Sequence, residues 1–592
     1  MSVGSAQGPG SRRSLPAQDQ STPSARWSRS TSSLWYADIL VGFGLAGLLY
    51  AVLALATSSH HHPVASAVSL SIRHLPLYAV YSLGRMLAAY ILSLIFSLVY
   101  GYLAVYNRRA EKILVPILDI LQSVPILSFL PSIVLALIAL FPHGTFGVEL
   151  ASILLVFTSQ AWNMTFSFYH SLLTIPSELR EVSALYGLSP WQRFRQLELP
   201  YSAVGLVWNS MMSWAGGWFF LMAAEMFTLG SRSFQLLGLG SYLQVAANRG
   251  DGGAELAGIG MLVLVIVLLD QLIWRPLLAW ADRFKIEFAT GSVPPRSAVL
   301  MLLRRSRMVE WTLEHVIAPG IERIDQRLSR PSVRGNARGR RRSVVTVVGW
   351  ALAAAVVVAL GFALWKGAML LATIPLTEAL RLPLGALLST LRVFGALLLS
   401  TVWTVPVGVF IGLSRNWAVR LQPVAQIFAS IPATALFPII VVWLLALGVK
   451  LGVLSVFLIM LASQWYILFN VIAGAMSIPQ DLKEATALFR LSSYARWRTL
   501  ILPGIFPFLV TGLITAAGGA WNATIVTEYV QVAGRSVSTL GLGSLIATSS
   551  AQAQYGMLLA STLLLSLVVV VANRLVWRRM YHLAETRYTL LL

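Results

Sequence analysis

Long apolar runs alternate with short polar segments along almost the whole chain. Each run has about 20 residues or more, the length that an α-helix needs to cross a hydrocarbon core of about 30 Å. Twelve runs are predicted to be membrane-spanning helices, at residues 35–57, 78–105, 115–141, 148–172, 202–228, 256–280, 344–365, 384–412, 425–447, 451–475, 505–530 and 554–576. The pattern therefore predicts an all-α polytopic membrane protein with about twelve transmembrane helices.

The apolar runs form two sets of six that repeat in sequence. Early in each set the matching residues are 307 positions apart, and after a shorter loop in the second set they are 303 apart. Matched pairs include Arg85 with Arg392, Pro131 with Pro438, Trp162 with Trp465, Trp218 with Trp521, Glu225 with Glu528, and Leu237-Gly-Leu-Gly-Ser241 with Leu540-Gly-Leu-Gly-Ser544. Because each set holds an even number of spans, the two halves are expected to share one orientation.

The repeat divides the chain into four parts. They are a disordered cytoplasmic tail (1–33), a first repeat (34–283), a basic cytoplasmic linker (284–343) and a second repeat (344–592). Residues 281–343 carry fourteen Arg or Lys against six Asp or Glu, and such positive charge keeps a segment in the cytoplasm. Residues 297–329 have apolar positions at helical spacing. That spacing fits an amphipathic helix on the membrane surface, and a solvated tether fits the segment equally well.

Composition excludes a soluble protein of this size. Of the 592 residues 57% are apolar and only 11% are charged, and the mean hydropathy is +0.73. The net charge of +21 could suggest nucleic acid, but Lys and Arg lie in the tail, the linker and the short loops beside apolar runs. That distribution follows the positive-inside rule, so the expected partner is the lipid bilayer and not nucleic acid. Cysteine is absent, which excludes disulfides and thiol chemistry.

One polar segment between apolar runs occurs in both repeats. The first copy is Glu181-Val-Ser-Ala-Leu-Tyr-Gly187, nine residues, then Leu197-Glu-Leu-Pro200; the second is Glu484-Ala-Thr-Ala-Leu-Phe-Arg490, nine residues, then Leu500-Ile-Leu-Pro503. The spacing predicts two small helices in each copy. Where the first copy has a glycine that can turn sharply, the second has arginine, so the second must turn without positive φ or carry strain.

The repeated segment resembles the signature loop of the permease subunits of binding-protein-dependent ABC importers. The family pattern is E-A-A, three residues, G, nine residues, I-x-L-P, and in that family the loop docks into a cleft of the cytoplasmic ATPase. This chain departs from the pattern at Val182, Ser183 and Arg490. The resemblance implies that the residues coupling to the ATPase are Glu181, Ala184, Gly187, Leu199, Pro200, Glu484, Ala487, Arg490, Leu502 and Pro503.

The resemblance implies a fused permease in which two subunits have become one chain. No G-x-x-x-x-G-K-[ST] motif occurs, so this chain is expected to be a transport subunit without an ATPase site of its own. ATP and Mg would bind two separate cytoplasmic ATPase subunits, and a substrate-binding protein would meet the opposite face. The implied location is the bacterial inner membrane, with a cytoplasmic N-terminus. The Ser-[Val/Ile]-Pro and Leu-Gly-Leu-Gly-Ser segments look most like the branch that imports nitrate, sulfonates, taurine or bicarbonate.

Within the spans, two groups of residues are candidates for the transport route. Prolines in the third span of each half, which kink a helix, are candidate gating kinks or simple packing kinks: Pro125, Pro131, Pro432 and Pro438. Polar and aromatic side chains inside spans are candidate pathway residues or interhelical hydrogen bonds: Gln160, Asn163, Trp218, Gln464, Trp465, Trp521 and Asn522. Glu225 and Glu528 fall near the outer ends of their spans, where water could solvate them, so they are interpreted as structural anchors or gate contacts and not as groups that compensate substrate charge.

Chemistry other than transport finds little support in the sequence. No catalytic constellation or metal-ligand spacing stands out, and the adjacent side chains of His60-His61-His62 point in different directions. The competing transport class is an ion-coupled secondary carrier, which can also have two parallel six-helix halves. Such a carrier needs ionisable groups inside the membrane, and carboxylates are nearly absent from the middle of these spans.

Overall fold

The computed structural model describes residues 68–123, 125–141, 146–229, 232–284, 297–312, 314–315, 318–328, 358, 361–362, 365–532 and 534–587. The predicted tail 1–33 and the first predicted span, 35–57, lie outside the described residues. So does most of the seventh predicted span, 344–365. The remaining ten predicted spans can be compared with the structure.

The first repeat is a bundle of long helices joined by short elements. We call the polar segment that occurs in both repeats, around residues 181–200 and 484–503, the paired segment. The helices of the first repeat before this segment are α2 (Leu75–Tyr106), α3 (Arg108–Ser123), α4 (Leu130–Leu140) and α5 (Phe146–Leu173). The paired segment contains α6 (Ser177–Leu185) and α7 (Pro190–Arg193), and the long helix α8 (Leu199–Glu225) follows. The repeat ends with strands β1 (Met226–Leu229) and β2 (Arg232–Gln235) and helices α9 (Leu239–Arg249), α10 (Gly252–Leu269) and α11 (Arg275–Ala281).

The second repeat has the same order of elements. It begins with α16 (Leu376–Ala379), α17 (Arg381–Leu413), α18 (Arg415–Ser430), α19 (Ala433–Ala446) and α20 (Leu451–Ser477). The paired segment contains α21 (Gln480–Leu488) and α22 (Ser493–Arg496), and α23 (Leu502–Thr527) follows. Strands β3 (Tyr529–Val532) and β4 (Arg535–Ser538) lead to α24 (Leu542–Ala551), α25 (Tyr555–Ala572) and α26 (Arg578–Arg587). Between the repeats, the linker forms α12 (Ala298–Arg305), α13 (Arg307–Thr312) and α14 (Ala318–Leu328).

The all-α membrane class predicted from the sequence is confirmed. Six helical segments among the described residues are long and apolar enough to cross a membrane: Ile72–Tyr106, Gly252–Phe284, Leu376–Leu413, Leu451–Ser477, Ser493–Thr527 and Tyr555–Ala584. The pair α18 and α19 makes a seventh if it is one span. In addition, each repeat contains a short antiparallel hairpin, β1 with β2 and β3 with β4. The apolar pattern did not predict these hairpins, because four residues are too few to show a strand period.

The third span of each half is broken, whereas the sequence predicted a continuous, kinked helix. Backbone ψ is 113° at Pro125 and 125° at Pro432, so both residues are extended. Helix α3 ends at Ser123 and α18 ends at Ser430. Helices α18 and α19 meet at 77°. The reason is that proline lacks an amide donor and also disfavours helical backbone in the residue before it, so the helix stops there.

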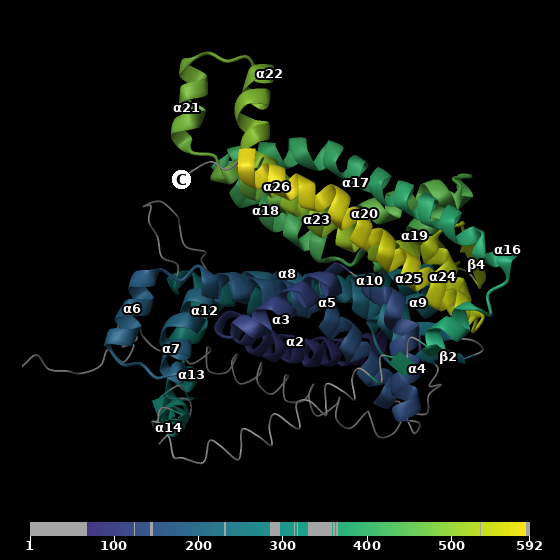
Figure 1. The fold of residues 1–592 in the computed structure, drawn as a ribbon, viewed down its shortest axis with the longest axis horizontal. Helices are drawn as coiled ribbons and strands as arrows, with labels where there is room; N and C mark the ends of the chain where they lie inside the picture. The colour runs from purple at the N-terminus through teal and green to yellow at the C-terminus, as the bar shows by residue number, and fades with distance from the viewer. Residues whose placement is uncertain are drawn as a thin grey trace, which may run out of the picture.

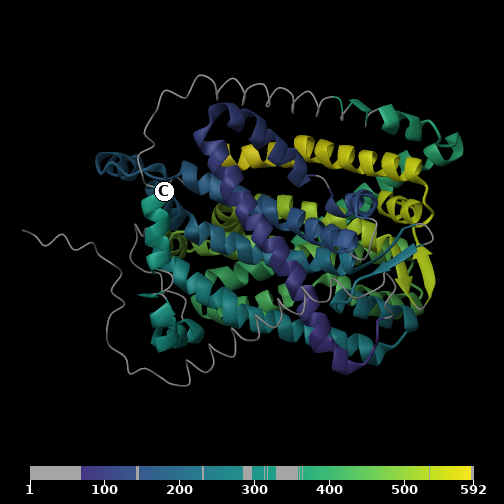
Figure 2. The same ribbon diagram turned by 90° about the horizontal axis from the view of Figure 1, so that it is seen from below.

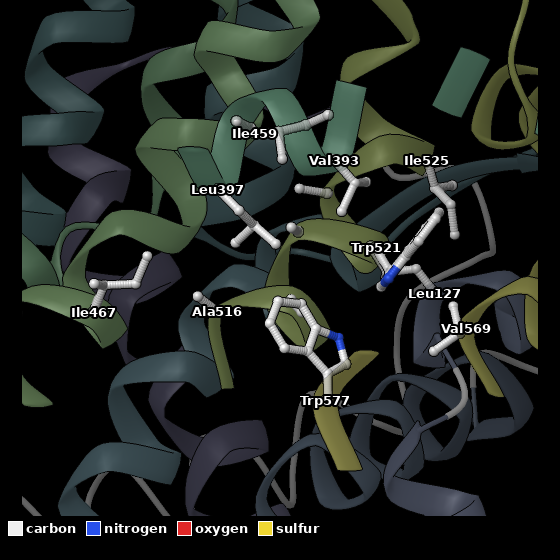
Figure 3. Close-up of a cluster of buried hydrophobic side chains, with 14 of the residues drawn as sticks. Leu127, Val393, Leu397, Ile459, Ile467, Ala516, Trp521, Ile525, Val569 and Trp577 are labelled. Atoms are coloured by element: carbon white, nitrogen blue, oxygen red, sulfur yellow. The ribbon is translucent and has the colours of Figure 1, made fainter. Parts of the chain in front are cut away.

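The largest apolar cluster is built from both halves. Its buried members come from both repeats, and they include Leu127 and Ala151 from the first and Trp521 and Ile525 from the second. Figure 3 shows Leu127 beside Trp521, with Ile525 close by. Burying apolar surface across this boundary holds the halves together as one unit.

The long helices place the short elements at two opposite ends. At one end lie α6 and α7 and, apart from them, α21 and α22, which project at the top of Figure 1 while α6 and α7 lie lower on its left side. At the other end lie the hairpins with α9, α16 and α24, and Figure 2 shows the same separation from below. We call these the loop end and the hairpin end.

Candidate functional site

The paired segments at the loop end have the same backbone geometry. Helices α6 and α21 each begin after a proline and each have nine residues. The amide of Gly187 donates to the carbonyl of Ala184, and the amide of Arg490 donates to the carbonyl of Ala487, at 3.0 Å in both cases. In each copy a left-handed residue therefore ends the first small helix, which is a common way for a helix to stop.

The sequence allowed the second copy either to turn without positive φ or to carry strain, and Arg490 adopts the strained, positive-φ conformation. Its φ is +49°, close to the +62° of Gly187 at the matching position. For a residue with a Cβ atom this conformation costs about 1–2 kcal/mol. The second copy therefore has the same left-handed turn, although arginine disfavours that conformation.

Each copy ends its first small helix with two exposed apolar side chains. Leu185 is 86% exposed and Tyr186 is 80% exposed, while Leu488 is 83% and Phe489 is 79% exposed. The predicted coupling glutamates, Glu181 and Glu484, are exposed on the same small helices. Adjacent apolar side chains held in solvent by a rigid turn are typical of a surface that a partner covers.

The remaining predicted coupling residues lie where each segment rejoins the membrane helices. Leu199 and Pro200 are the first two residues of α8, and Leu502 and Pro503 are the first two of α23. Proline fits there because the first turn of a helix has no internal acceptor for its amide.

The first paired segment is held by contacts that its second copy lacks. The buried Glu198 carboxylate accepts from Arg193 Nε at 2.7 Å and from the Tyr106 hydroxyl. Asp325 of linker helix α14 accepts from Trp191 Nε1 at 2.8 Å and pairs with Arg195 Nη2 at 2.7 Å.

In the second copy, isoleucine and tyrosine stand at the positions of Glu198 and Trp191, as Ile501 and Tyr494, and Tyr494 is exposed. Burial, together with the nearby positive charge of Arg496, lowers the pKa of Lys483 there. The two segments thus have similar backbone conformations, but different side-chain contacts stabilise them.

The sequence left open whether the linker is a helix on the membrane surface or a free tether, and the contact of Asp325 with the first paired segment helps to answer this. In the part of the linker that the structure describes, α14 packs against α7, where Asp325 accepts from Trp191. Apolar side chains of the linker helices also remain exposed, including Met301, Trp311 and Ile324. The linker is therefore attached to the first paired segment, and its exposed apolar side chains still fit a membrane surface.

A cavity of about 230 Å³ lies between the halves near the hairpin end. Its walls come from η2 (Ile126–Phe129), α4, α8 and α9 of the first repeat and from α19, α23, β3 and α24 of the second. The polar side chains on it are uncharged: Gln244, Thr434, Tyr529, Gln531 and Ser550. Gln244 Nε2 donates to the carbonyl of Gln531 at 3.3 Å, which joins the halves beside the cavity. The sequence does not predict these residues, because nothing in the repeat marks which polar positions face the boundary.

The predicted pathway residues do not gather in this cavity. Trp218 lines a cavity of about 60 Å³ and Trp465 lines one of about 90 Å³. Trp521 is buried in the shared core, and Gln464 is also buried. Asn522 Oδ1 accepts from the amide of Leu127 at 3.2 Å, an interhelical hydrogen bond between the halves.

Gln160 and Asn163 lie on α5. Gln160 is fully buried, and neither atom of its amide has a hydrogen-bond partner in the described part of the chain. Asn163 is half-buried. The structure therefore brings Gln160 and Asn163 to one helix but not to the cavity between the halves.

The predicted gating prolines take two kinds of position. Pro131 and Pro438 line the cavity between the halves. Pro432 borders the smaller cavity that contains Trp465, and Pro125 precedes the turn that carries Leu127. All four therefore lie at the boundary between the halves or next to it.

Water does not reach Glu225 and Glu528, and the structure gives them the anchoring role that the sequence favoured. Both are fully buried. Glu225 accepts from Arg85 Nη1 at 2.7 Å and from Ser82 Oγ at 2.6 Å. Glu528 accepts from Arg392 and Ser389 in the same way, at 2.8 and 2.7 Å. A carboxylate can be buried when an arginine and hydroxyl or amide donors replace its water.

These buried carboxylates explain the repeated Leu-Gly-Leu-Gly-Ser segment. Glu225 Oε2 accepts from the amide of Gly240 at 2.7 Å, and Glu528 Oε2 accepts from the amide of Gly543 at 2.9 Å. A Cβ atom on Gly238 would lie 2.3 Å from Glu225 Oε2. Glycine is therefore needed there because the carboxylate touches the backbone. The oxygens of each carboxylate are occupied by hydrogen bonds that join elements of the hairpin end. This argues against a role for these carboxylates in ion coupling.

Comparison with known proteins gives two matches to one protein family within this chain. The family is described as "Binding-protein-dependent transport system inner membrane component", and it matches residues 93–273 and 404–583. The chain belongs to this family. Each match begins within α2 or α17 and contains one paired segment, one hairpin and one buried carboxylate. This member of the binding-protein-dependent transport family is therefore a fused permease with its domain present twice.

Individual relatives in this family are similar over part of their length. The taurine transport system permease protein TauC of Escherichia coli (strain K12) is 26% identical over 185 residues, which cover 31% of this chain and 61% of TauC. The bicarbonate transport system permease protein CmpB of Synechococcus elongatus is 29% identical over 143 residues, 24% of this chain and 50% of CmpB. The nitrate import permease protein NrtB of the same species is 29% identical over 153 residues, 26% of this chain and 53% of NrtB. The chain thus spans about half to three fifths of the length of these relatives.

Proposed function

We propose that this chain is the membrane permease of an ABC importer and couples to two separate ATPase subunits through its paired segments. The observation that carries the proposal is the pair of rigid turns at the loop end, each of which holds two apolar side chains in solvent. A docking surface with a buried apolar centre gains most of its binding energy from such side chains. Two similar turns at the same end suit two copies, or two close relatives, of one partner.

The proposed translocation route runs along the boundary between the halves. The cavity of about 230 Å³ opens there, beside the two prolines Pro131 and Pro438. Broken helices beside a cavity are tolerated in membranes where freed backbone groups face protein or water. Motion of the paired segments would reach the cavity through α8 and α23, because these helices begin at the segments and also line the cavity.

The proposed substrate is a small anion of the nitrate, sulfonate or taurine, or bicarbonate type. Relatives whose names give taurine, bicarbonate and nitrate as their cargo support this proposal. The cavity offers amide and hydroxyl groups without charged side chains. Such a lining can bind an anion through hydrogen bonds while leaving it free to move on. A binding protein at the hairpin end would supply the selectivity.

Coupling is tested with the purified chain, its cognate ATPase and two loop variants. Leu185→Ser with Tyr186→Ser changes the first turn, and Leu488→Ser with Phe489→Ser changes the second. Each variant should retain less ATPase in a pull-down and lose uptake, because each removes one apolar contact surface. Leu376→Ser is the matched control, since Leu376 is 77% exposed but lies at the hairpin end.

Two results would contradict the coupling proposal. One is ATP hydrolysis by the highly purified chain alone. The other is full ATPase binding by both loop variants. The substrate is tested separately by uptake of nitrate, taurine and bicarbonate into proteoliposomes with the cognate binding protein, and uptake of none of these anions by an ATP-hydrolysing complex would refute the substrate class.

A further inference from the structure

The two buried arginines at the hairpin end differ in what surrounds their guanidinium groups. In the first half Arg85 has two carboxylate partners. Its Nη1 donates to Glu225 at 2.7 Å, while its Nε and Nη2 both donate to Glu149, at 2.6 and 2.7 Å. The Nε and Nη2 edge thus holds a carboxylate in the bidentate geometry that arginine favours.

In the second half the matching edge has no carboxylate from the chain. Arg392 Nη1 donates to Glu528 at 2.8 Å, as in the first half. The residue that corresponds to Glu149 is Gly452, which has no side chain. Arg392 Nη2 donates to the hydroxyl of Thr539 at 3.1 Å, and Nε has no hydrogen-bond partner among the described residues. Arg392 is only 9% exposed as a whole, but its unpartnered Nε is not fully enclosed, so solvent reaches this donor edge.

Gly452 lies against the Nη2 atom of Arg392 and the hydroxyl of Thr539. A Cβ atom on Gly452 would have two neighbours within 4 Å, Thr539 Oγ1 at 3.3 Å and Arg392 Nη2 at 3.5 Å. Thr539 also lines a cavity of about 360 Å³ at the hairpin end, where Glu378 and Arg381 are the charged side chains. The other polar side chains on that cavity are Ser538, Ser544, Thr548, Ser549, Gln552 and Gln554.

Part of this polar lining differs between the halves. Where the cavity has Thr548 and Ser549, the first half has Val245 and Ala246. The substitution of hydroxyls for apolar side chains thus accompanies the substitution of glycine for glutamate at position 452. Both differences make the second half more suitable for a polar ligand from solution.

We propose that Arg392, Thr539 and the backbone at Gly452 form a binding site for a small planar oxyanion such as bicarbonate, nitrate or a short carboxylate. The anion takes the place that the Glu149 carboxylate has in the first half, with one oxygen on Nε and one on Nη2. The start of α20 at Leu451 adds the positive end of a helix dipole. The first half shows that the fold accommodates a second carboxylate at this position. The site goes beyond the proposed function, because its existence does not depend on transport or on an ATPase.

The test measures anion binding to the full chain in nanodiscs of zwitterionic lipid. Acetate and nitrate are titrated against chloride at constant ionic strength, with heat of binding and thermal stability as the readouts. The wild type should bind one acetate. Gly452→Glu supplies an internal carboxylate and should weaken acetate binding by roughly tenfold or more. Gly252→Glu is the matched control and should still bind, because it adds the same carboxylate at an exposed position in the first half with nothing within 4 Å of an added Cβ atom.

A second variant tests the reasoning in the opposite direction. Glu149→Gly opens the same edge on Arg85, so the stoichiometry should rise from one acetate to two. The proposal is overturned if the wild type shows no preference for acetate or nitrate over chloride. It is also overturned if Gly452→Glu binds acetate as the wild type does. Neither result bears on transport, so this proposal and the transport proposal fail separately.

Discussion

Gly541 is the position where the structure makes the sharpest prediction about stability. Its φ of 179° is ordinary extended backbone, so an alanine would not be strained by conformation. A Cβ atom there, however, would lie 2.1 Å from Glu528 Oε2 and 2.4 Å from Glu528 Cδ. Gly541→Ala must therefore push the buried carboxylate aside.

The cost follows from what the Glu528 carboxylate binds. It accepts from Ser389 Oγ, Arg392 Nη1 and the amides of Gly543 and Ser544, at 2.7, 2.8, 2.9 and 3.3 Å. A shift of about 1 Å takes several of these contacts beyond hydrogen-bonding distance. Disrupting a buried ion pair in this way costs about 3–5 kcal/mol. For a unit the size of one half, that loss lowers the Tm by roughly 10 °C.

Thermal unfolding of the detergent-solubilised chain, followed by size-exclusion fluorescence, measures the change. Gly518→Ala is the matched control, because Gly518 lies in α23 with nothing within 4 Å of an added Cβ atom. It should be neutral or stabilise the helix by up to about 1 kcal/mol. A double-mutant cycle with Glu528→Ala then identifies the cause, since all three close neighbours of the added Cβ atom at Gly541 belong to Glu528.

In the Glu528→Ala background, Gly541→Ala should cost less than about 1 kcal/mol, because the atoms that it meets are gone. Losses that simply add in the double mutant would refute the steric argument. Equal Tm values for Gly541→Ala and Gly518→Ala would refute it as well. Gly238→Ala should repeat the result in the first half, through Glu225.

Three further predictions concern the loop end. Arg490→Gly should relieve about 1 kcal/mol of left-handed backbone strain and preserve coupling. Gly187→Arg should reduce substrate-stimulated ATPase activity. A larger loss of that activity for Arg490→Gly would show that the arginine binds the partner. Asp325→Asn should increase hydrogen exchange at residues 189–198, whereas Glu322→Gln on the same helix is the control and should not. Equal exchange in the two variants would mean that the α14 contact does not stabilise the first paired segment. Cleavage within 329–343, which leaves α14 attached to the first half, should preserve uptake, and loss of uptake in an assembled complex would show that the join itself matters.

The sequence alone determined the class of the protein and its division into halves. Apolar runs of about 20 residues predict spanning helices because a backbone in lipid must satisfy its hydrogen bonds within the helix. The repeat offsets placed Glu225 with Glu528 and the two glycine-rich segments with each other. The paired segments were visible because their signal is local: a fixed spacing of small, turn-forming and capping residues.

What the sequence could not supply depends on contacts between residues far apart in the chain. Glu225 is buried because Arg85, 140 positions earlier, neutralises it, so its position near the end of a span does not by itself decide whether water reaches it. Asn522 joins the halves through Leu127, 395 positions away. The glycines of Leu-Gly-Leu-Gly-Ser stood out as a motif, but only the structure shows that a carboxylate occupies the place of their missing side chains. Apolar periodicity specifies which segments enter the membrane, whereas the partner of each buried polar group is decided by how those segments pack.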